Sequence, residues 1–349
     1  MDFVGKLKDA AIFVTGGAGF VGSNLVKRVL ELGAAKVLVI DNLLSAEREN
    51  LPQDSRLEFI YGSAADKNIL NQLQDEYDYG FHLVTFHGNQ SSIFDPVRDH
   101  DNNTLPTLMV CERIRDFKKL KKIVYSSAGC TVAKKTYDTA DATTEESPVS
   151  LYLDSPYQMS KIFGEFYFNY YFKQYCVPVV KARFQNVYGP GEVLGAGDWR
   201  GTPATIWRNV TPAFIYRALN DMELTVENNG IATRDFIYVD DIVNGLILCA
   251  VKGKEGEVYN LASGVETSIM ELAKTIIELS GTGKIDFMPA RDWDNSGKRY
   301  GSTGKAEQEL GFHVKIDIRE GLEKTILWTK ENMSRIKVAI QKHKDFITV

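Results

Sequence analysis

The sequence predicts an α/β protein built on a doubly wound parallel sheet, followed by a smaller α/β lobe. Short apolar runs alternate with longer amphipathic stretches over residues 11–182, and a glycine-rich turn follows the first run. The composition changes after about residue 186, where Gly, Pro and Trp become frequent. At about 100–200 residues per domain, a chain of 349 residues suits a division into two parts.

The expected strands are six short runs rich in β-branched residues. Such runs are typical of parallel strands that are buried on both faces. They are residues 11–15, 36–40, 57–61, 81–86, 122–127 and 177–184. The stretches between them are long enough for crossover helices, so residues 1–185 are expected to form one domain.

Residues 186–349 are expected to form mainly the smaller lobe, with some segments returning to the first domain. Residues 186–207 are typical of a long loop, and long loops in compact domains are usually functional. Residues 210–220 and 268–280 are expected to be helices, and residues 235–251 a strand that leads into a helix. This lobe would cover the carboxyl edge of the sheet.

Composition and charge exclude several classes of protein. The formal net charge is −5 and the basic residues are dispersed, which argues against a nucleic-acid partner. The chain has four cysteines, Cys111, Cys130, Cys176 and Cys249. They form no CxxC pair and no metal-type spacing, so we expect each to remain a free thiol and the protein to bind no metal. No apolar run approaches the ~20 residues of a membrane span, and the polar N-terminus is unlike a signal peptide. We therefore expect a cytoplasmic protein with no membrane partner.

The first expected strand passes into a helix through the sequence TGGAGFVG, which contains Gly16, Gly19, Phe20 and Gly22. Glycines at these points permit a tight turn, close approach of the backbone to a pyrophosphate, and close packing of helix on strand. The helix N-terminus also offers free N–H groups and a positive dipole to phosphates. The turn therefore predicts a dinucleotide site, because it stands between a strand and a helix.

Asp41 indicates which dinucleotide is bound. It ends the second run, about 20 positions after Gly22, where an acid accepts hydrogen bonds from the adenosine ribose hydroxyls and repels a 2′-phosphate. Asn42 follows, and no arginine is adjacent to hold such a phosphate. The sequence thus predicts NAD rather than NADP, and a Rossmann domain over residues 1–185.

Tyr157 and Lys161 are the candidate catalytic pair. Their i, i+4 spacing places both side chains on one face of a helix. An ammonium group beside a phenol stabilises the phenolate and lowers the phenol's pKa, so Tyr157 would take a proton from a sugar or alcohol hydroxyl. The alternative is that both residues merely decorate a helix surface.

Taken together, these motifs resemble the extended short-chain dehydrogenase/reductase family, in its branch of NAD-dependent nucleotide-sugar epimerases and dehydratases. The resemblance continues in YSSAG, YQMSK, ARFQNVYGPGE, TRDFIYVDDIVNGL and GEVYNLASG, and covers nearly the whole chain. It implies a Rossmann fold, a tightly held NAD that is regenerated in each turnover, a sugar oxidised first at C4, and a homodimer. Polysaccharide biosynthesis is the pathway that the resemblance suggests.

The resemblance also implies individual roles. Tyr157 would be the catalytic base, and Lys161 its partner and a ribose ligand. The further cofactor contacts implied are Asn42, Ser63, Ala64, Leu83 and Asn103. Ser63 departs from the family's pattern, which often has Asp at this position near the adenine. The substrate contacts implied are Asn186, Arg234 and Arg291 at a diphosphate and Asn209 at the nucleotide. Guanidinium groups suit phosphate oxygens, although each arginine could instead form a surface ion pair.

Cys130 is the least expected residue of the site. Ala128 stands where similar C4 epimerases have Ser or Thr, and no Asp-Glu pair of the dehydratase type follows it. Ser127 is near enough to supply a hydroxyl. Cys130 occupies the position of the dehydratase Glu and of an acid/base cysteine in GDP-mannose 3,5-epimerase, so its thiol could act at C5 or C3 of a 4-keto sugar. The alternative is a small buried filler.

Two further residues are candidates for contact with the sugar. Arg200, in GDWRG, resembles the position of a catalytic Lys in that epimerase and could bind an enolate or a carboxylate. His87, in TFHGNQSS, could carry a proton or be a hydrogen-bonded loop residue. The sequence thus favours a UDP-sugar epimerase. The alternatives are a dehydratase, a plain C4 epimerase, a non-catalytic nucleotide-binding regulator, and an NADPH-dependent ketone reductase, which Asp41 opposes.

Overall fold

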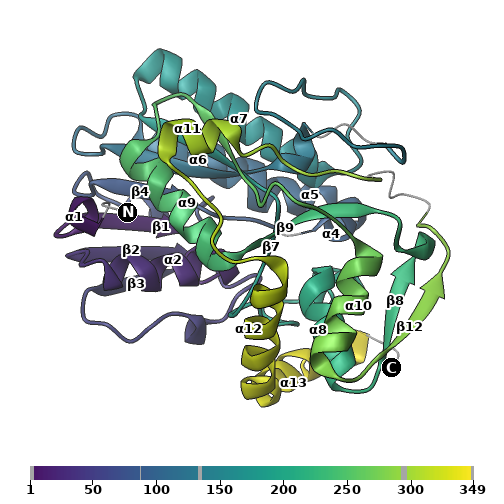
Figure 1. Cartoon of the computed structure of the whole chain (residues 1–349). Coiled ribbons are helices and arrows are strands. Elements are labelled where there is room, and N and C mark those ends of the chain that lie inside the picture. Colours follow the sequence, from purple (N-terminus) through teal and green to yellow (C-terminus); the bar gives the residue numbers. More distant parts are fainter. Residues whose placement is uncertain (1–3, 87, 133–135, 292–296, 347–349) are drawn as a thin grey trace.

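The computed structural model describes residues 4–86, 88–132, 136–291 and 297–346, without the side chain of Cys130. Figure 1 shows strands β1 to β4 on the left and a second lobe, with α8, α10, β8 and β12, on the right. Within the described ranges, no helix is both long and apolar enough to cross a membrane.

The central sheet has seven strands in the order β10-β6-β5-β4-β1-β2-β3, and all neighbouring pairs are parallel. The strands are β1 (Ala11–Thr15), β2 (Lys36–Asp41), β3 (Leu57–Tyr61), β4 (Tyr79–His82), β5 (Lys122–Ala128), β6 (Val179–Phe184) and β10 (Val258–Leu261). This architecture confirms the predicted doubly wound parallel sheet.

Two strands differ from the sequence prediction. β4 ends at His82 rather than at residue 86. The side chain of Asn103 hydrogen-bonds both backbone groups of Phe86, so these groups are not paired with a neighbouring strand. Asn103 Oδ1 accepts from Phe86 N at 2.7 Å, and Asn103 Nδ2 donates to Phe86 O at 3.3 Å. The seventh strand, β10, lies far along the chain and pairs with β6, so a segment beyond residue 185 belongs to the central sheet.

Helices cover both faces of this sheet. Ile12 and Val14 of β1 join one core with side chains of α2 and α9, whereas Phe13 joins a separate core with side chains of α6 and α7. Alternation of side chains along a strand explains why the runs are apolar throughout. The helices are α1 (Val4–Leu7), α2 (Phe20–Glu31), α3 (Lys67–Leu70), α4 (Asn89–Phe94), α5 (Pro96–Asp99), α6 (Leu105–Ile114), α7 (Pro156–Tyr175), α8 (Val210–Leu219), α9 (Val239–Lys252), α10 (Ile269–Ser280), α11 (Gly304–Leu310), α12 (Ile318–Glu331) and α13 (Met333–Gln341).

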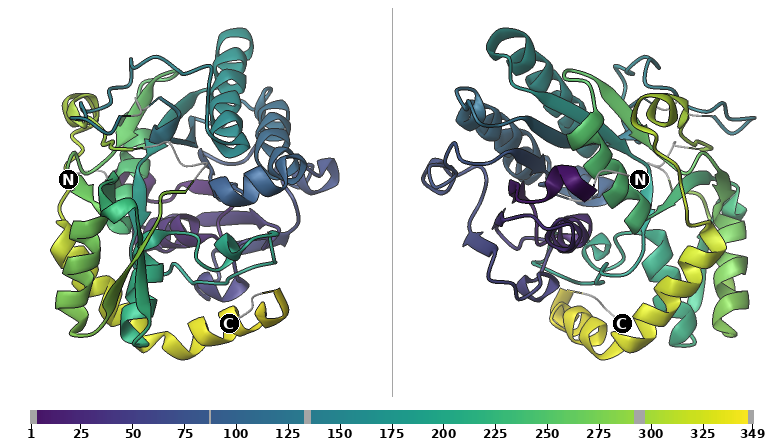
Figure 2. Two further views of the ribbon diagram at one scale, coloured as in Figure 1. Left: turned by 90° about the vertical axis from the view of Figure 1, so that its right-hand side faces the viewer. Right: turned by 60° about the vertical axis from the view of Figure 1, so that its left-hand side comes forward.

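The second lobe contains two small sheets. Three strands form one, in the order β11 (Glu266–Ser268), β9 (Thr233–Tyr238) and β7 (Asn186–Tyr188), and β8 (Glu223–Glu227) pairs in parallel with β12 (Lys284–Met288). The helices expected over residues 210–220 and 268–280 are α8 and α10. Ser268 caps α10 through a capping box with Glu271. Figure 2 shows the yellow C-terminal helices along the lower edge of the molecule.

Candidate functional site

Two neighbouring cavities lie at the carboxyl end of the central sheet. The smaller, of about 60 Å³, is lined by the glycine turn and by residues that follow β2, β3 and β4. The larger, of about 640 Å³, lies between the sheet and the second lobe. Gly16, Gly19, Ser45, Leu83 and Thr85 line both, so the two cavities form one continuous site.

The glycine turn connects β1 to α2 with no room for side chains. Gly16 has a φ of 78°, and a Cβ there would lie 2.7 Å from the backbone of Leu83. A Cβ on Gly22 would collide with the carbonyl oxygen of Gly16. Gly19 is the N-cap residue of α2, and no side chain caps the helix. The uncapped N–H groups and the open backbone fit the pyrophosphate of a dinucleotide.

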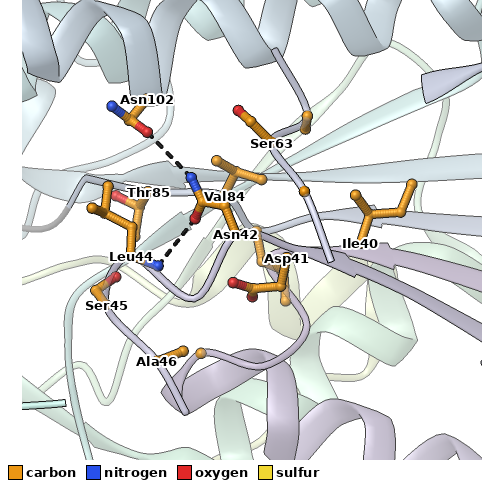
Figure 3. Close-up of a pocket in the computed structure, with 15 residues that line it drawn as sticks. Ile40, Asp41, Asn42, Leu44, Ser45, Ala46, Ser63, Val84, Thr85 and Asn102 are labelled. Carbon is orange, nitrogen blue, oxygen red and sulfur yellow. Dashed lines mark hydrogen bonds between the residues drawn. The ribbon is translucent and has the colours of Figure 1, made fainter. Parts of the chain in front are cut away.

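Asp41 lies at the floor of the smaller cavity (Figure 3). Its Oδ2 accepts a hydrogen bond from Ala18 N at 2.9 Å, and its Oδ1 accepts one from Leu43 N at 2.8 Å. Burial raises the pKa of this carboxyl group, while the backbone donors oppose that shift. Each carboxylate oxygen has a second acceptor site, so Asp41 retains capacity for the ribose hydroxyls of NAD.

The other predicted cofactor contacts, apart from Asn103, divide into two groups. Asn42, Ser63, Ala64 and Leu83 line the smaller cavity. Figure 3 shows Asn42 between Asn102, to which its amide donates at 3.4 Å, and Leu44, whose N–H donates to it at 3.1 Å. The remaining members, Phe20, Gly22, Tyr157 and Lys161, line the larger cavity.

Asn103 lines neither cavity. It is 3% exposed, and its amide bonds the backbone of Phe86 and Oδ1 of Asp99 at 2.7 Å. Asp99 also accepts from Ser160 Oγ at 2.5 Å. Asn103 itself belongs to a π-helical turn, η2 (His100–Thr104), a feature that is frequent at functional sites. In the structure Asn103 therefore positions the chain after β4.

Tyr157 and Lys161 both project from α7 toward the larger cavity. Pro156 begins this helix and Ser155 caps it. Lys161 Nζ lies 5.9 Å from the centre of the Tyr157 ring and donates to the carbonyl oxygen of Ser126 at 3.0 Å. Lys161 is only 4% exposed. The ammonium group is thus held by β5 close to the phenol, in water-poor surroundings that strengthen its electrostatic effect.

His82, which the sequence did not single out, lies beneath this pair. Its ring is fully buried between the hydroxyl groups of Thr15, at 2.6 Å, and Thr107, at 3.0 Å. Burial and the charge of Lys161 lower its pKa to about 3. The imidazole is therefore neutral, and Lys161 remains the cation next to Tyr157.

Ser127 faces the larger cavity and rests on a buried ion pair. Its hydroxyl donates to Glu165 Oε1 at 2.5 Å, and Arg183 binds the same carboxylate through Nε and Nη2, both at 2.8 Å. Because its proton is engaged by Glu165, Ser127 presents lone pairs rather than a donor to the cavity. Ala128 lines the cavity beside it.

The predicted substrate contacts are mostly brought together. Asn186, Asn209, Arg234 and Arg291 line the larger cavity. Arg234 donates to the carbonyl oxygen of Gly297 at 2.7 Å, and Arg291 Nε donates to Glu227 at 2.6 Å. The amide of Asn209 donates to Glu192, a residue that sequence reasoning missed. Glu192 is 3% exposed, and burial raises its pKa to about 7.

Three candidates stand apart from this set. Arg200 lines neither cavity, because its guanidinium group is buried against the carbonyl oxygens of Leu44, at 3.4 Å, and Thr205, at 3.0 Å. His87 lies outside the described residues. Cys130 belongs to the short helix η3 (Gly129–Thr131) after β5, and its side chain is outside the description.

Known proteins share both the sequence pattern and the fold. A sequence model of the NAD-dependent epimerase/dehydratase family matches residues 12–262, more than half of the chain. The crystal structure of WbmF from Bordetella bronchiseptica with NAD⁺ is 56% identical, covers 98% of this chain and 99% of that one, and has a TM-score of 0.88. A second crystal structure of WbmF contains NAD⁺ and UDP.

Two curated relatives differ in activity. A UDP-glucose 4-epimerase from Mycolicibacterium smegmatis is 31% identical over 90% of this chain and 96% of its own length. A dTDP-D-glucose 4,6-dehydratase from Dictyostelium discoideum is 26% identical over 92% of this chain and 82% of its own length. These matches confirm the predicted branch and the prediction of NAD as cofactor. The chain belongs to the NAD-dependent epimerase/dehydratase family of extended short-chain dehydrogenases/reductases.

Proposed function

We propose that this enzyme is a nucleotide-sugar epimerase that acts on a UDP-sugar through transient oxidation at C4. The observation that carries the proposal is the position of Tyr157 and Lys161, which share the larger cavity with the glycine turn. The smaller cavity, with Asp41 at its floor, is the proposed site of the adenosine half of NAD. The UDP held by WbmF and the UDP-glucose epimerase among the relatives favour a uridine nucleotide.

When bound, NAD supplies a hydride acceptor that is restored within each turnover. The ammonium group of Lys161 stabilises the phenolate form of Tyr157, which takes the proton of the sugar's C4 hydroxyl and becomes a neutral phenol. Ser126 fixes Lys161 through its carbonyl oxygen, so the charge stays at one distance from the phenol. The neutral His82 beneath them adds no competing charge.

The diphosphate of the substrate would be bound by Arg234 and Arg291, with Asn186 and Asn209 as neutral donors. Both arginines now donate to acceptors at the cavity wall, a carbonyl oxygen and Glu227. Phosphate oxygens are stronger acceptors for guanidinium groups than a carbonyl oxygen is. Substrate binding would therefore redirect the side chain of Arg234 into the cavity.

The proposal has a finer part, which concerns the carbon that is inverted. Ala128 lines the cavity where a hydroxyl is usual, so Ser127 is the nearest oxygen that β5 presents. Cys130 follows in η3, at the carboxyl end of the same strand. We propose that its thiol exchanges a proton at C5 or C3 of the 4-keto sugar. Elimination of water by the same residues is the second candidate, favoured by the dehydratase among the relatives.

The experiment is incubation with NAD and a panel of UDP-sugars in D₂O, followed by proton NMR and mass spectrometry. Deuterium at C5 or C3 that disappears in Cys130→Ala would support carbon-acid chemistry. Inversion at C4 without deuterium, unchanged in Cys130→Ala, would leave a plain C4 epimerase. Tyr157→Phe should lower turnover by about 10²–10⁴-fold in either case. Normal turnover in that variant would contradict the proposed base.

We also propose a homodimer that forms through α7. Met159, Phe163, Phe166 and Tyr170 follow one another at helical spacing, and each is 42–52% exposed. Such a stripe of large apolar residues marks an interaction surface. Phe166→Glu should shift the protein toward monomer in sedimentation velocity. An unchanged sedimentation coefficient would place the interface elsewhere.

A further inference from the structure

The segment after β2 forms the wall of the smaller cavity. We call residues 42–50 the cofactor loop. Leu44, Ser45 and Ala46 line the cavity, and the side chain of Asn42 bonds the loop internally and to Asn102. If NAD occupies this cavity, as proposed above, the cofactor loop lies directly against it.

The second lobe holds the outer side of this loop through residues 197–208. Asp198 N donates to Leu44 O at 2.9 Å, and Arg208 Nη1 donates to Ser45 O at 3.1 Å. The two backbones touch, since a Cβ on Gly197 would lie 2.5 Å from Ser45 Cα. The contact therefore joins the two lobes at the wall of the cofactor cavity.

Arg200 is buried in this contact at a considerable electrostatic cost. Its guanidinium group donates to the carbonyl oxygens of Leu44, Asp198 and Thr205. Burial and the nearby charges of Arg208 and Arg98 lower its pKa to about 8. Among the described residues, its Nε has no hydrogen-bond partner. A cation in such surroundings is expensive to bury, which argues that the contact it makes serves a purpose.

The C-terminal helix α13 holds the other end of the loop. Arg335 Nη2 donates to Glu47 Oε2 at 3.1 Å and to Asn50 Oδ1 at 2.5 Å. Asn50 in turn donates to the carbonyl oxygen of Ala18 at 2.8 Å, and Ala18 N is the donor to Asp41. A chain of hydrogen bonds thus runs from α13 through the loop to the glycine turn.

We propose that the second lobe and α13 clasp the cofactor loop shut over NAD, and that Arg200, Arg208 and Arg335 are positioning residues that retain the cofactor between turnovers. Such a clasp explains why Arg200, expected at the substrate, lies instead behind the loop. It also serves the chemistry proposed above, because an enzyme that restores its own hydride acceptor gains nothing from releasing it. The inference rests on the proposed place of NAD in the smaller cavity.

The test measures cofactor release rather than turnover. The full-length protein is loaded with NADH, an excess of NAD⁺ is added, and the loss of bound NADH fluorescence gives the dissociation rate. Arg335→Met removes donors to a carboxylate and an amide, so release should become about 10- to 100-fold faster. Arg335→Lys keeps the positive charge on a single donor nitrogen. Its rate of NADH release should therefore fall between the rates of Arg335→Met and wild type.

Two further variants complete the test. Arg319→Met removes an exposed arginine on the adjacent helix α12, which pairs with Glu278 and not with the loop, and should release NADH at the wild-type rate. Arg200→Met should accelerate release as Arg335→Met does. If Arg200→Met does not fold, Arg335→Met and Arg335→Lys still decide whether the clasp retains NADH.

The outcomes separate this inference from the proposed function. Equal release rates in wild type, Arg335→Met and Arg319→Met would overturn the clasp and leave the epimerase proposal intact. Failure of the wild type to bind NADH would overturn the proposed cofactor site itself. Faster release in Arg335→Met, with an unchanged KM for the nucleotide sugar, would support the clasp.

Discussion

The two cavities of the site are built in different ways. Residues 16–85 and Asn102 supply the whole lining of the smaller cavity, so β1 to β4 and the segments after them form most of it within one part of the chain. The larger cavity collects side chains from Gly16 to Arg299 and from both lobes. The first is a nearly finished binding site, whereas the second depends on how the lobes meet.

The difference extends to charge. At the smaller cavity, backbone N–H groups satisfy the one buried acid, Asp41. At the larger cavity, Glu192 Oε2 has no hydrogen-bond partner among the described residues, and Glu192 bonds Asn209 through its other oxygen. The buried acid of the cofactor side is therefore hydrogen-bonded through both oxygens, while the substrate side holds a buried acid, Glu192, that is hydrogen-bonded through one oxygen and lies near Arg208.

Glu192 should make the stability of the protein depend on pH. Its pKa rises from 4.5 to about 7 on folding, so between these values the folded state binds more protons than the unfolded state. The free energy of unfolding must then fall as the pH rises from about 4.5 to 7, by up to about 3 kcal/mol. Glu192→Gln should lose this fall, as measured by urea unfolding at pH 4 to 8 with saturating NAD.

The matched control is Glu278→Gln. Glu278 is exposed, and its pKa is lowered by Arg319 rather than raised. Glu278→Gln should therefore not raise the free energy of unfolding at pH 7 relative to its value at pH 4.5, when each is compared with wild type. Parallel curves for wild type and Glu192→Gln would show that folding does not shift the pKa of Glu192, and would remove the contrast between the two cavities.

Sequence reasoning predicted the fold and the cofactor from residues that are close along the chain. The glycine turn, Asp41 and the alternating apolar runs are local patterns, and the spacing of Tyr157 and Lys161 is one helical turn. The supporting contacts join distant positions. Glu165 and Arg183 are 18 residues apart, Asp99 and Ser160 are 61 apart, and Leu44 and Arg200 are 156 apart. No local pattern predicts such pairs, and the resemblance placed Arg200 at the substrate rather than behind the cofactor loop.

Arg234 provides the sharpest test of the contrast between the cavities, although the effect expected from its replacement is smaller than that expected from Glu192→Gln. Its guanidinium group donates to the carbonyl oxygens of Thr233 and Gly297, at the wall of the larger cavity and away from the smaller one. Loss of one charge-assisted contact with a diphosphate should raise the KM for the UDP-sugar by about tenfold in Arg234→Gln. The amount of NAD bound per protomer should not change, because Arg234 does not line the smaller cavity.

The control for this variant is Arg319→Gln, which removes an exposed arginine of the same charge far from either cavity. Steady-state kinetics and the absorbance of released cofactor give both quantities for each protein. A raised KM with full NAD content would show that the two cavities bind their ligands independently. A parallel loss of NAD in Arg234→Gln would mean that the second lobe completes the cofactor site as well, and the cavities would then act as a single unit.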